Sequence, residues 1–201
     1  MTPSQSSPQS SAVPSFSKQM RQLKLVFWGP GSSGKTTLIR FLSNRLHPLV
    51  ASNRIEISTS EDHTLLSDYL AIQLPLNSLI ILLHVVTTTG QRRLLCTREF
   101  AAAGADGILF IADSQQEAKT ENCRSYEELR AYLAIINRQV PVVIMANKQD
   151  LPGCLRPTTI RKHLQPPPET PVFGASALDG TGVQSVFQRL VQEVLAKFVA
   201  S

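Results

Sequence analysis

Apolar runs that are typical of strands alternate along the chain with segments in which apolar residues recur at helical intervals. The strand-like runs are Leu23–Trp28, Tyr69–Leu76, Ser78–Val86, Gly107–Ala112, Val140–Ala146 and Val172–Gly174. The helical patterns are Lys35–Leu46, Leu94–Ala103, Cys123–Asn137, Thr158–Leu164 and Val183–Phe198. This alternation predicts an α/β fold with a mainly parallel sheet and helices on both faces. Asn77-Ser78 predicts a hairpin, which makes one edge strand antiparallel.

The first twenty residues break this pattern, because most of them are Ser, Pro or Gln and Lys18 carries the only charge. Such a segment cannot bury enough apolar area to offset the entropy that it would lose on ordering. We therefore predict a disordered tail over residues 1–20 and one folded domain over residues 21–201.

Composition narrows the function only a little. The formal net charge is +5, but basic residues are scattered among acidic ones, which disfavours a nucleic-acid partner. The longest apolar stretch, Leu79–Val86, is interrupted by His84 and is too short to span a membrane. Cys96, Cys123 and Cys154 have neither the spacing of a metal site nor that of a disulfide pair. We expect a cytoplasmic protein without a lipid anchor or integral membrane segment, monomeric when free.

A phosphate-binding pattern follows the first predicted strand and opens the first predicted helix. The residues that satisfy G-x-x-x-x-G-K-[ST] are Gly29, Pro30, Gly31, Ser32, Ser33, Gly34, Lys35 and Thr36. The glycines let successive backbone N–H groups face one centre, and the helix N-terminus adds positive potential. Lys35 would bring its charge to the β- and γ-phosphates, and Thr36 would place its hydroxyl on Mg²⁺. An ordinary Gly/Ser turn is the alternative, which the strand-loop-helix context disfavours.

The segment Asn147-Lys148-Gln149-Asp150 indicates which base the bound nucleotide carries. It follows the end of a predicted strand, and open α/β sheets bind their ligands at such strand ends. Guanine offers a ring N–H and an exocyclic amine side by side, and the Asp150 carboxylate can accept both hydrogen bonds. We expect Lys148 to lay its alkyl stem along the base and Asn147 to tie this loop to the phosphate loop. The loop after the last predicted strand contributes Ser176, Ala177 and Leu178. A backbone N–H of that loop suits guanine O6.

With these motifs the chain resembles the Ras-like small GTPases over Gln22 to Phe198, and within them it looks most like the bacterial MglA-type polarity GTPases. The narrower likeness depends on the segments 28–37, 87–91 and 110–115. In particular, Thr87 stands where most Ras-like proteins have the aspartate of D-x-x-G, as it does in MglA-type proteins. The resemblance implies a P-loop NTPase G domain with a six-stranded sheet. It also implies GTP hydrolysis coupled to a switch.

The resemblance also assigns roles to residues beyond the two nucleotide loops. The Gly90 N–H would bind the γ-phosphate, and Gln91 would orient the attacking water. Thr64 would contact Mg²⁺ and the γ-phosphate, with Thr59 as the second choice. The implied catalytic residues are Gln91, Lys35 and Thr64, the implied metal ligands are Thr36 and Thr64, and Thr37 joins the nucleotide-binding set. The implied partners are GTP or GDP, Mg²⁺, a dimeric roadblock-type GTPase-activating protein and effectors.

The metal site departs from the usual Ras-like pattern, because neutral Thr87 removes one negative charge near the cation. Asp62, Asp68 or Asp113 could compensate, but each of them could equally be a turn cap or an exposed acid.

The implied intrinsic arginine finger is also absent from its usual place, since His63 precedes Thr64 where MglA-type proteins have arginine. Histidine is mostly neutral near pH 7, and an arginine finger contributes roughly three to five decades of rate. Hydrolysis should therefore be slow unless Arg92 or Arg93 substitutes. We predict that His63→Arg raises the intrinsic rate in a single-turnover assay. An unchanged or lower rate would count against the placement of Thr64.

Two other functions stay open at this stage. One is a module that holds GTP or GDP but scarcely hydrolyses it, which the residues His63 and Thr87 would explain. The other is a P-loop ATPase or kinase with a basic surface for nucleic acid, which Asn147 to Asp150 disfavours.

Overall fold

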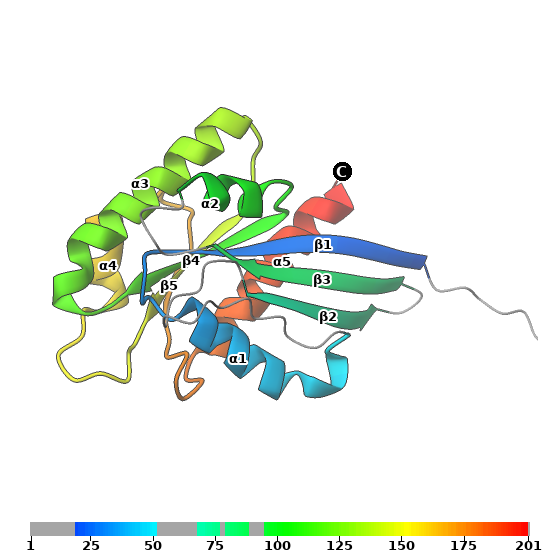
Figure 1. Ribbon diagram of the computed structural model, residues 1–201, viewed down its shortest axis with the longest axis horizontal. Coiled ribbons are helices and arrows are strands. Elements are labelled where there is room, and N and C mark those ends of the chain that lie inside the picture. Colours follow the sequence, from blue (N-terminus) through cyan, green and yellow to red (C-terminus); the bar gives the residue numbers. More distant parts are fainter. Residues whose placement is uncertain (1–18, 52–67, 77–78, 89–94, 201) are drawn as a thin grey trace, which may run out of the picture.

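The computed structural model describes residues 19–51, 68–76, 79–88 and 95–200, which form a sheet of six strands covered by helices (Figure 1). The strands are β1 (Gln19–Trp28), β2 (Tyr69–Leu76), β3 (Leu79–Thr87), β4 (Gly107–Asp113), β5 (Val142–Asn147) and β6 (Val172–Gly174). Their order is β2-β3-β1-β4-β5-β6. All neighbours are parallel except β2 and β3, so the antiparallel strand lies at an edge. The predicted fold class is confirmed.

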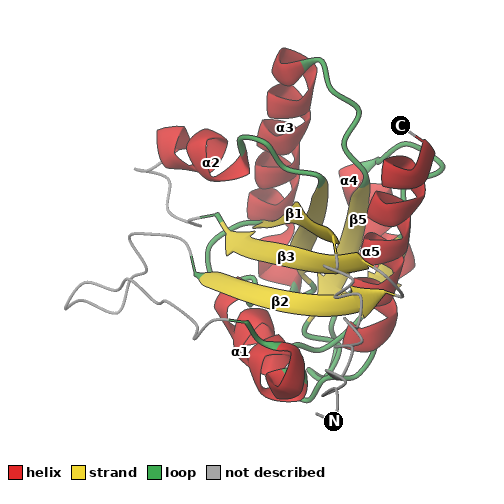
Figure 2. Ribbon diagram, turned by 90° about the vertical axis from the view of Figure 1, so that its right-hand side faces the viewer, coloured by secondary structure: helices red, strands yellow, loops and turns green. Residues whose placement is uncertain are grey.

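The helices cover both faces of the sheet (Figure 2). They are α1 (Lys35–Arg45), α2 (Leu95–Ala102), α3 (Lys119–Ile136), α4 (Pro157–Leu164) and α5 (Val183–Ala200), with short 3-10 helices at His47–Leu49 and Gln116–Ala118. Alternate residues of β1 face opposite cores, since Leu25 and Phe27 pack with α1 and α5, whereas Val26 and Trp28 pack with α3 and α4. This two-sided burial explains why the central strands read as continuous apolar runs.

Two elements begin earlier than the sequence pattern predicts. β1 starts at Gln19 because Gln19–Gln22 pair in register with Leu79–Leu82 of β3, although their side chains have no apolar pattern. α3 starts at Lys119, one turn before the predicted Cys123, and its polar first turn includes Asn122. The Asn122 side chain exchanges hydrogen bonds with the Asp113 backbone, at 2.9 Å to its N and 2.7 Å to its O. Tertiary hydrogen bonds therefore set both boundaries.

Two side chains of the central strands, those of Trp28 and His84, have structural roles. Trp28 is buried, stacks on Tyr132 and donates its indole N–H to the Ser125 carbonyl at 3.1 Å. His84 lies within β3 and pairs across the hairpin with Tyr69, whose hydroxyl is 2.6 Å from His84 Nδ1. Among the helices of the described ranges, none has the length and apolar character needed to cross a membrane.

Candidate nucleotide-binding site

The phosphate loop connects the buried end of β1 to the first turn of α1. Gly34 precedes the helix with φ of +97°, a left-handed conformation that favours glycine. A Cβ atom there would lie 2.2 Å from Asn147 Nδ2, so the position is restricted by contact as well as by conformation. The loop is thus shaped both by its own backbone and by the end of β5.

The variant Gly34→Ala, compared with a control, should distinguish the effect of the contact with Asn147 from the effect of backbone strain. The strain alone is expected to lower the free energy of unfolding by about 1 to 3 kcal/mol, and displacement of Asn147 should add to the loss and weaken GDP binding. Chemical unfolding and GDP titration measure the two effects.

The matched control is Gly153→Ala. Gly153 also has a positive φ, of +71°, but a Cβ atom there has nothing within 4 Å. The Gly153→Ala variant should lose free energy of unfolding through strain but keep its affinity for GDP. Equal GDP affinities in the two variants would contradict the role assigned to Gly34.

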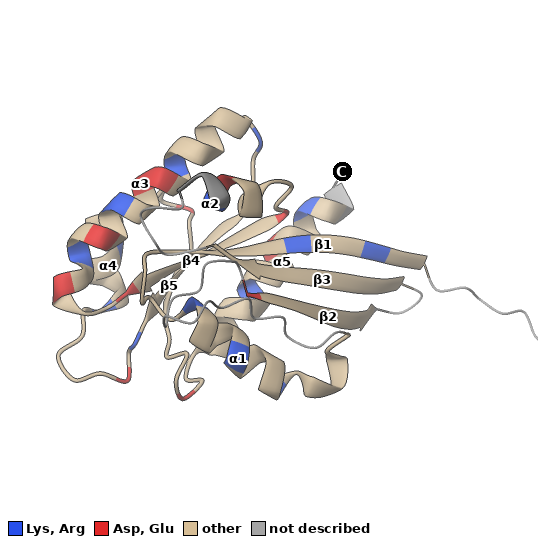
Figure 3. Ribbon diagram, in the orientation of Figure 1, with Lys and Arg blue, Asp and Glu red and all other residues tan. Residues whose placement is uncertain are grey.

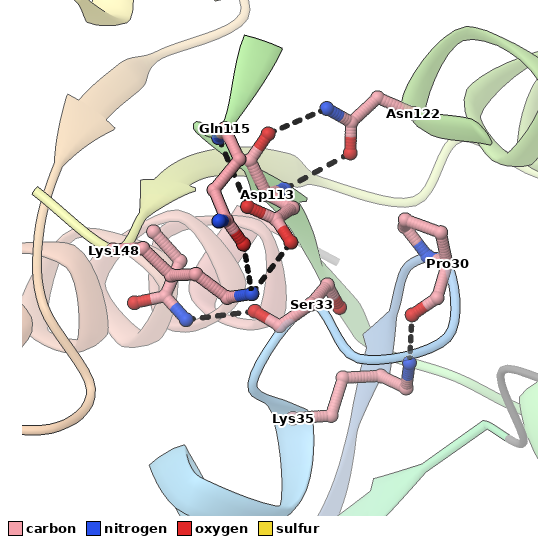
Figure 4. Close-up of polar contacts among 8 residues, drawn as sticks. Pro30, Ser33, Lys35, Asp113, Gln115, Asn122 and Lys148 are labelled. Atoms are coloured by element: carbon pink, nitrogen blue, oxygen red, sulfur yellow. Dashed lines mark hydrogen bonds and ion pairs between the residues drawn. The ribbon is translucent and has the colours of Figure 1, made fainter. Parts of the chain in front are cut away.

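Lys35 lies inside the phosphate loop, where its Nζ donates to the Gly29 carbonyl at 2.9 Å. It also donates to the Pro30 carbonyl at 2.6 Å (Figure 4). Burial lowers the pKa of Lys35 to about 7, with the charge of Arg98 acting in the same direction and that of Asp68 opposing it. Phosphate oxygens would favour the charged amine, because an adjacent anion stabilises the ammonium form. The predicted phosphate-binding lysine is therefore placed at the centre of the loop.

Asn147 connects three loops at the carboxyl end of the sheet. It is 2% exposed, and its side-chain Nδ2 donates to the Ser33 carbonyl at 2.7 Å. Its Oδ1 accepts from the Ala177 N–H at 2.9 Å. The predicted tie between this loop and the phosphate loop is confirmed, and it extends to the loop after β6.

Lys148 is held by the end of β4. Its Nζ donates to Asp113 Oδ2 at 2.6 Å and to Gln115 Oε1 at 2.9 Å (Figure 4). Asp113 also caps its turn, because its Oδ1 accepts from the Gln115 N–H at 3.0 Å. The head of Lys148 is thus fixed while its stem stays available as an apolar surface for a planar base.

A hollow of about 230 Å³ lies between these loops. Its lining residues are Gly34, Thr37, Asn147, Lys148, Asp150, Leu151, Ala177 and Leu178. The Asp150 side chain is exposed at this hollow, and among the described residues no hydrogen-bond partner occupies its carboxylate. The three sequence segments predicted to bind a guanine nucleotide therefore surround one hollow.

The loop after β6 differs in detail from the expectation. The Ala177 N–H is engaged by Asn147, and the Leu178 N–H donates to Ser176 Oγ at 3.3 Å. Leu178 is 75% exposed, so its side chain covers the rim of the hollow instead of packing in the core. Gln149 has a structural role, since its Nε2 donates to Ser114 Oγ and to the Leu155 carbonyl.

Asp68 brings a carboxylate to the predicted metal site, although the sequence left it among several alternatives. Thr36 Oγ1 donates to Asp68 Oδ2 at 2.7 Å. Thr87 Oγ1 lies 3.4 Å from the same oxygen and accepts from the Asp68 N–H at 2.8 Å. Asp68 is fully buried, so a carboxylate lies beside the hydroxyls of Thr36 and Thr87.

These oxygen donors fit Mg²⁺, which prefers hard oxygen ligands and retains several waters beside one or two protein groups. Within the described ranges no three His, Cys, Asp or Glu residues form a metal cluster. The carboxylate of Asp68 and the hydroxyls of Thr36 and Thr87 would suit a cation that is also held by phosphate oxygens.

Several residues predicted to act in catalysis lie outside the described residues. They are His63, Thr64, Gly90, Gln91, Arg92 and Arg93, together with Thr59 and Asp62. Their roles stay predictions. Thr88, two positions before Gly90, is buried, and its N–H is bonded to the Phe27 carbonyl.

The sheet order, the phosphate loop after β1 and the Asn-Lys-x-Asp loop after β5 define a guanine-nucleotide-binding P-loop domain. Residues 24–196 match the model of the Ras family, and the chain belongs to that family of small GTPases. The family binds GTP or GDP with Mg²⁺ and acts as a switch together with regulators or effectors.

The relatives cover nearly the whole chain. It is 32% identical over 186 residues to the Mutual gliding-motility protein MglA of Myxococcus xanthus (strain DK1622), covering 90% of this chain and 95% of that protein. It is 30% identical over 189 residues to ADP-ribosylation factor-like protein 4D of Homo sapiens, covering 91% and 88%. It is also 24% identical over 179 residues to Ras-related protein RABG3c of Arabidopsis thaliana, covering 86% and 82%. These findings confirm the predicted likeness to MglA-type GTPases.

Proposed function

We propose that this chain is a guanine-specific switch that hydrolyses GTP slowly on its own. The observation that carries the proposal is the hollow shared by Gly34, Lys148 and Asp150, with Asn147 bonded to the loops on both sides. The position of Asp150 suits the paired N–H donors of guanine, whereas adenine offers no such pair there.

Each group of the site has a defined task in this proposal. Lys35 and the loop N–H groups hold the β- and γ-phosphates, and Gln91 orients the attacking water. Thr36, together with Thr64 and the buried carboxylate of Asp68, would hold Mg²⁺. Bound Mg²⁺ would supply neutralisation of the charge that develops on the phosphate oxygens.

Slow turnover follows from the residue before Thr64. His63 lacks the permanent charge of an arginine finger, which is worth roughly three to five decades of rate. We infer that a partner raises the rate, and that this partner is a dimeric roadblock-type activator. The name of the Myxococcus xanthus relative refers to gliding motility. That name supports a role for this chain in bacterial cell polarity or motility through effectors.

Competition binding tests the nucleotide specificity. The purified chain, loaded with fluorescent GDP in excess Mg²⁺, should release it to unlabelled GTP or GDP at concentrations at least about a hundredfold below those of ATP or ADP, since two charge-assisted hydrogen bonds distinguish the bases. Equal competition by ATP and GTP would overturn the proposal in favour of an adenine-nucleotide enzyme. Tight GDP binding without any GTP hydrolysis would favour the second candidate, a module that holds the nucleotide without turnover.

A further inference from the structure

A buried arginine lies on the inner face of α2, the helix that follows the segment predicted to act in catalysis. Arg98 is 4% exposed, and at helical spacing it shares its face with Ala101 and Ala102, which are also buried. Glu99 and Phe100 are exposed. Among the α2 side chains that the structure describes, Arg98 is therefore the long side chain of the buried face.

Arg98 joins α2 to α3, which lies beside it (Figure 1). Its Nη1 donates to Glu128 Oε2. Glu128 is also paired within α3, since its Oε1 lies 3.3 Å from Arg124 Nε. Figure 3 shows that α3 carries acidic and basic residues along its length, so this pair belongs to a charged stretch of the helix.

Burial makes Arg98 dependent on this carboxylate. Burial lowers the pKa of Arg98, and the charge of Glu128 opposes that shift. Removal of one partner from a buried ion pair costs more than the pair itself contributes, because the remaining charge loses its compensation without regaining water. The pair therefore fixes the distance between α2 and α3.

Arg98 is also close to the phosphate loop. Burial is the largest cause of the lowered pKa of Lys35, and the charge of Arg98 is the second. In the sequence, α2 begins at Leu95, four positions after Gln91. Because four residues of chain reach at most about 14 Å, the placement of α2 limits the region that Gln91 can occupy.

We propose that Arg98 is a positioning residue for GTP hydrolysis, which holds α2 against α3 through Glu128 and so sets where Gln91 meets the γ-phosphate. This inference rests on the proposed function, because it needs Gln91 to orient the attacking water. Misplacement of a reacting group by about 1 Å can cost about a hundredfold in rate. Nucleotide binding should not depend on the pair, since the hollow is lined by the phosphate loop, α1, β5 and the loops that follow β5 and β6.

Single-turnover GTP hydrolysis by the full chain in excess Mg²⁺ tests this inference. Arg98→Gln should slow hydrolysis by about ten- to a hundredfold and leave the Kd for GDP unchanged, which also establishes that the variant folds. Glu128→Gln should have the same effect, and it breaks the contact from its more accessible side, since the Glu128 side chain is 23% exposed. The parent rate in both variants, or a loss of GDP affinity as large as the loss of rate, would overturn the inference.

The matched control is Arg124→Gln, which removes the same charge beside the same carboxylate but leaves α2 bonded to α3. It should hydrolyse GTP at the parent rate, because a partly exposed ion pair within one helix contributes little. Equal losses in Arg124→Gln and Arg98→Gln would show that charge near the site, and not the link between the helices, governs the rate. That result would overturn the inference as well.

Combination with Gln91→Ala distinguishes positioning from a direct effect on the phosphate. Residues that act as a unit are not additive, so Arg98→Gln should slow the Gln91→Ala variant by less than about twofold. A loss as large as in the parent background would show that Arg98 does not act through Gln91. GTP that stays intact on the parent would overturn the proposed function and this inference together, whereas an active parent with fully active Arg98 and Glu128 variants overturns this inference alone.

Discussion

Asp150→Asn should lower the affinity for GDP and GTP by at least about a hundredfold, because a carboxylate that accepts two hydrogen bonds contributes roughly 1.5 to 3 kcal/mol through each. The amide would also present an N–H group to the N–H groups of guanine. Xanthine has a carbonyl in place of the guanine amine, so the variant should gain affinity for xanthosine diphosphate. Competition with fluorescent GDP measures both changes.

The stability of the Asp150 variant should be unchanged, since that side chain is exposed at the hollow. Glu169→Gln removes the same charge from an exposed loop that does not line the hollow, and it should leave both affinities unaltered. An Asp150→Asn protein that keeps its GDP affinity would show that this carboxylate does not recognise the base.

Asp68→Asn should weaken Mg²⁺ binding to the GDP-bound protein by about ten- to a hundredfold, the usual cost of losing a supporting group at a metal site. The amide oxygen can still accept from the Thr36 hydroxyl, so the substitution changes charge more than shape. The rate of GDP release, followed against free Mg²⁺ concentration, gives the shift.

Asp106→Asn is the control for this charge, because the Asp106 carboxylate is also hydrogen-bonded but is only partly buried and lies at the other end of the sheet. Its Mg²⁺ dependence should equal that of the parent protein. If Asp68→Asn releases GDP with the same Mg²⁺ dependence as the control, Asp68 does not take over the charge that Thr87 lacks.

The parts of the site that consist of contiguous residues could be predicted from the sequence alone. The phosphate loop and the Asn-Lys-x-Asp loop are each contiguous, and each follows a strand whose apolar run is clear, so both could be placed at one edge of a sheet. The hydrogen bond from Asn147 to Ser33 could also be predicted, because the two loops belong to strands of one parallel sheet.

The position of Asp68 could not be predicted in the same way. Asp68 is 32 positions from Thr36 and 19 from Thr87. The pairing of β2 with β3 brings its carboxylate to Thr87, and the pairing of β3 with β1 brings both to the phosphate loop. The sequence did contain a hint of this position, since Asp68 immediately precedes the predicted strand Tyr69–Leu76. The same is true of Asp113, whose ion pair with Lys148 depends on the pairing of β4 with β5.

The most direct measurement is single-turnover GTP hydrolysis by the purified full chain in excess Mg²⁺, with Gln91→Ala beside it under the same conditions. The account predicts slow but complete conversion of bound GTP by the parent and a loss of about two decades or more in the variant, as expected when a group that orients the attacking water is removed. GTP that stays bound and intact on the parent protein would contradict a working GTPase switch.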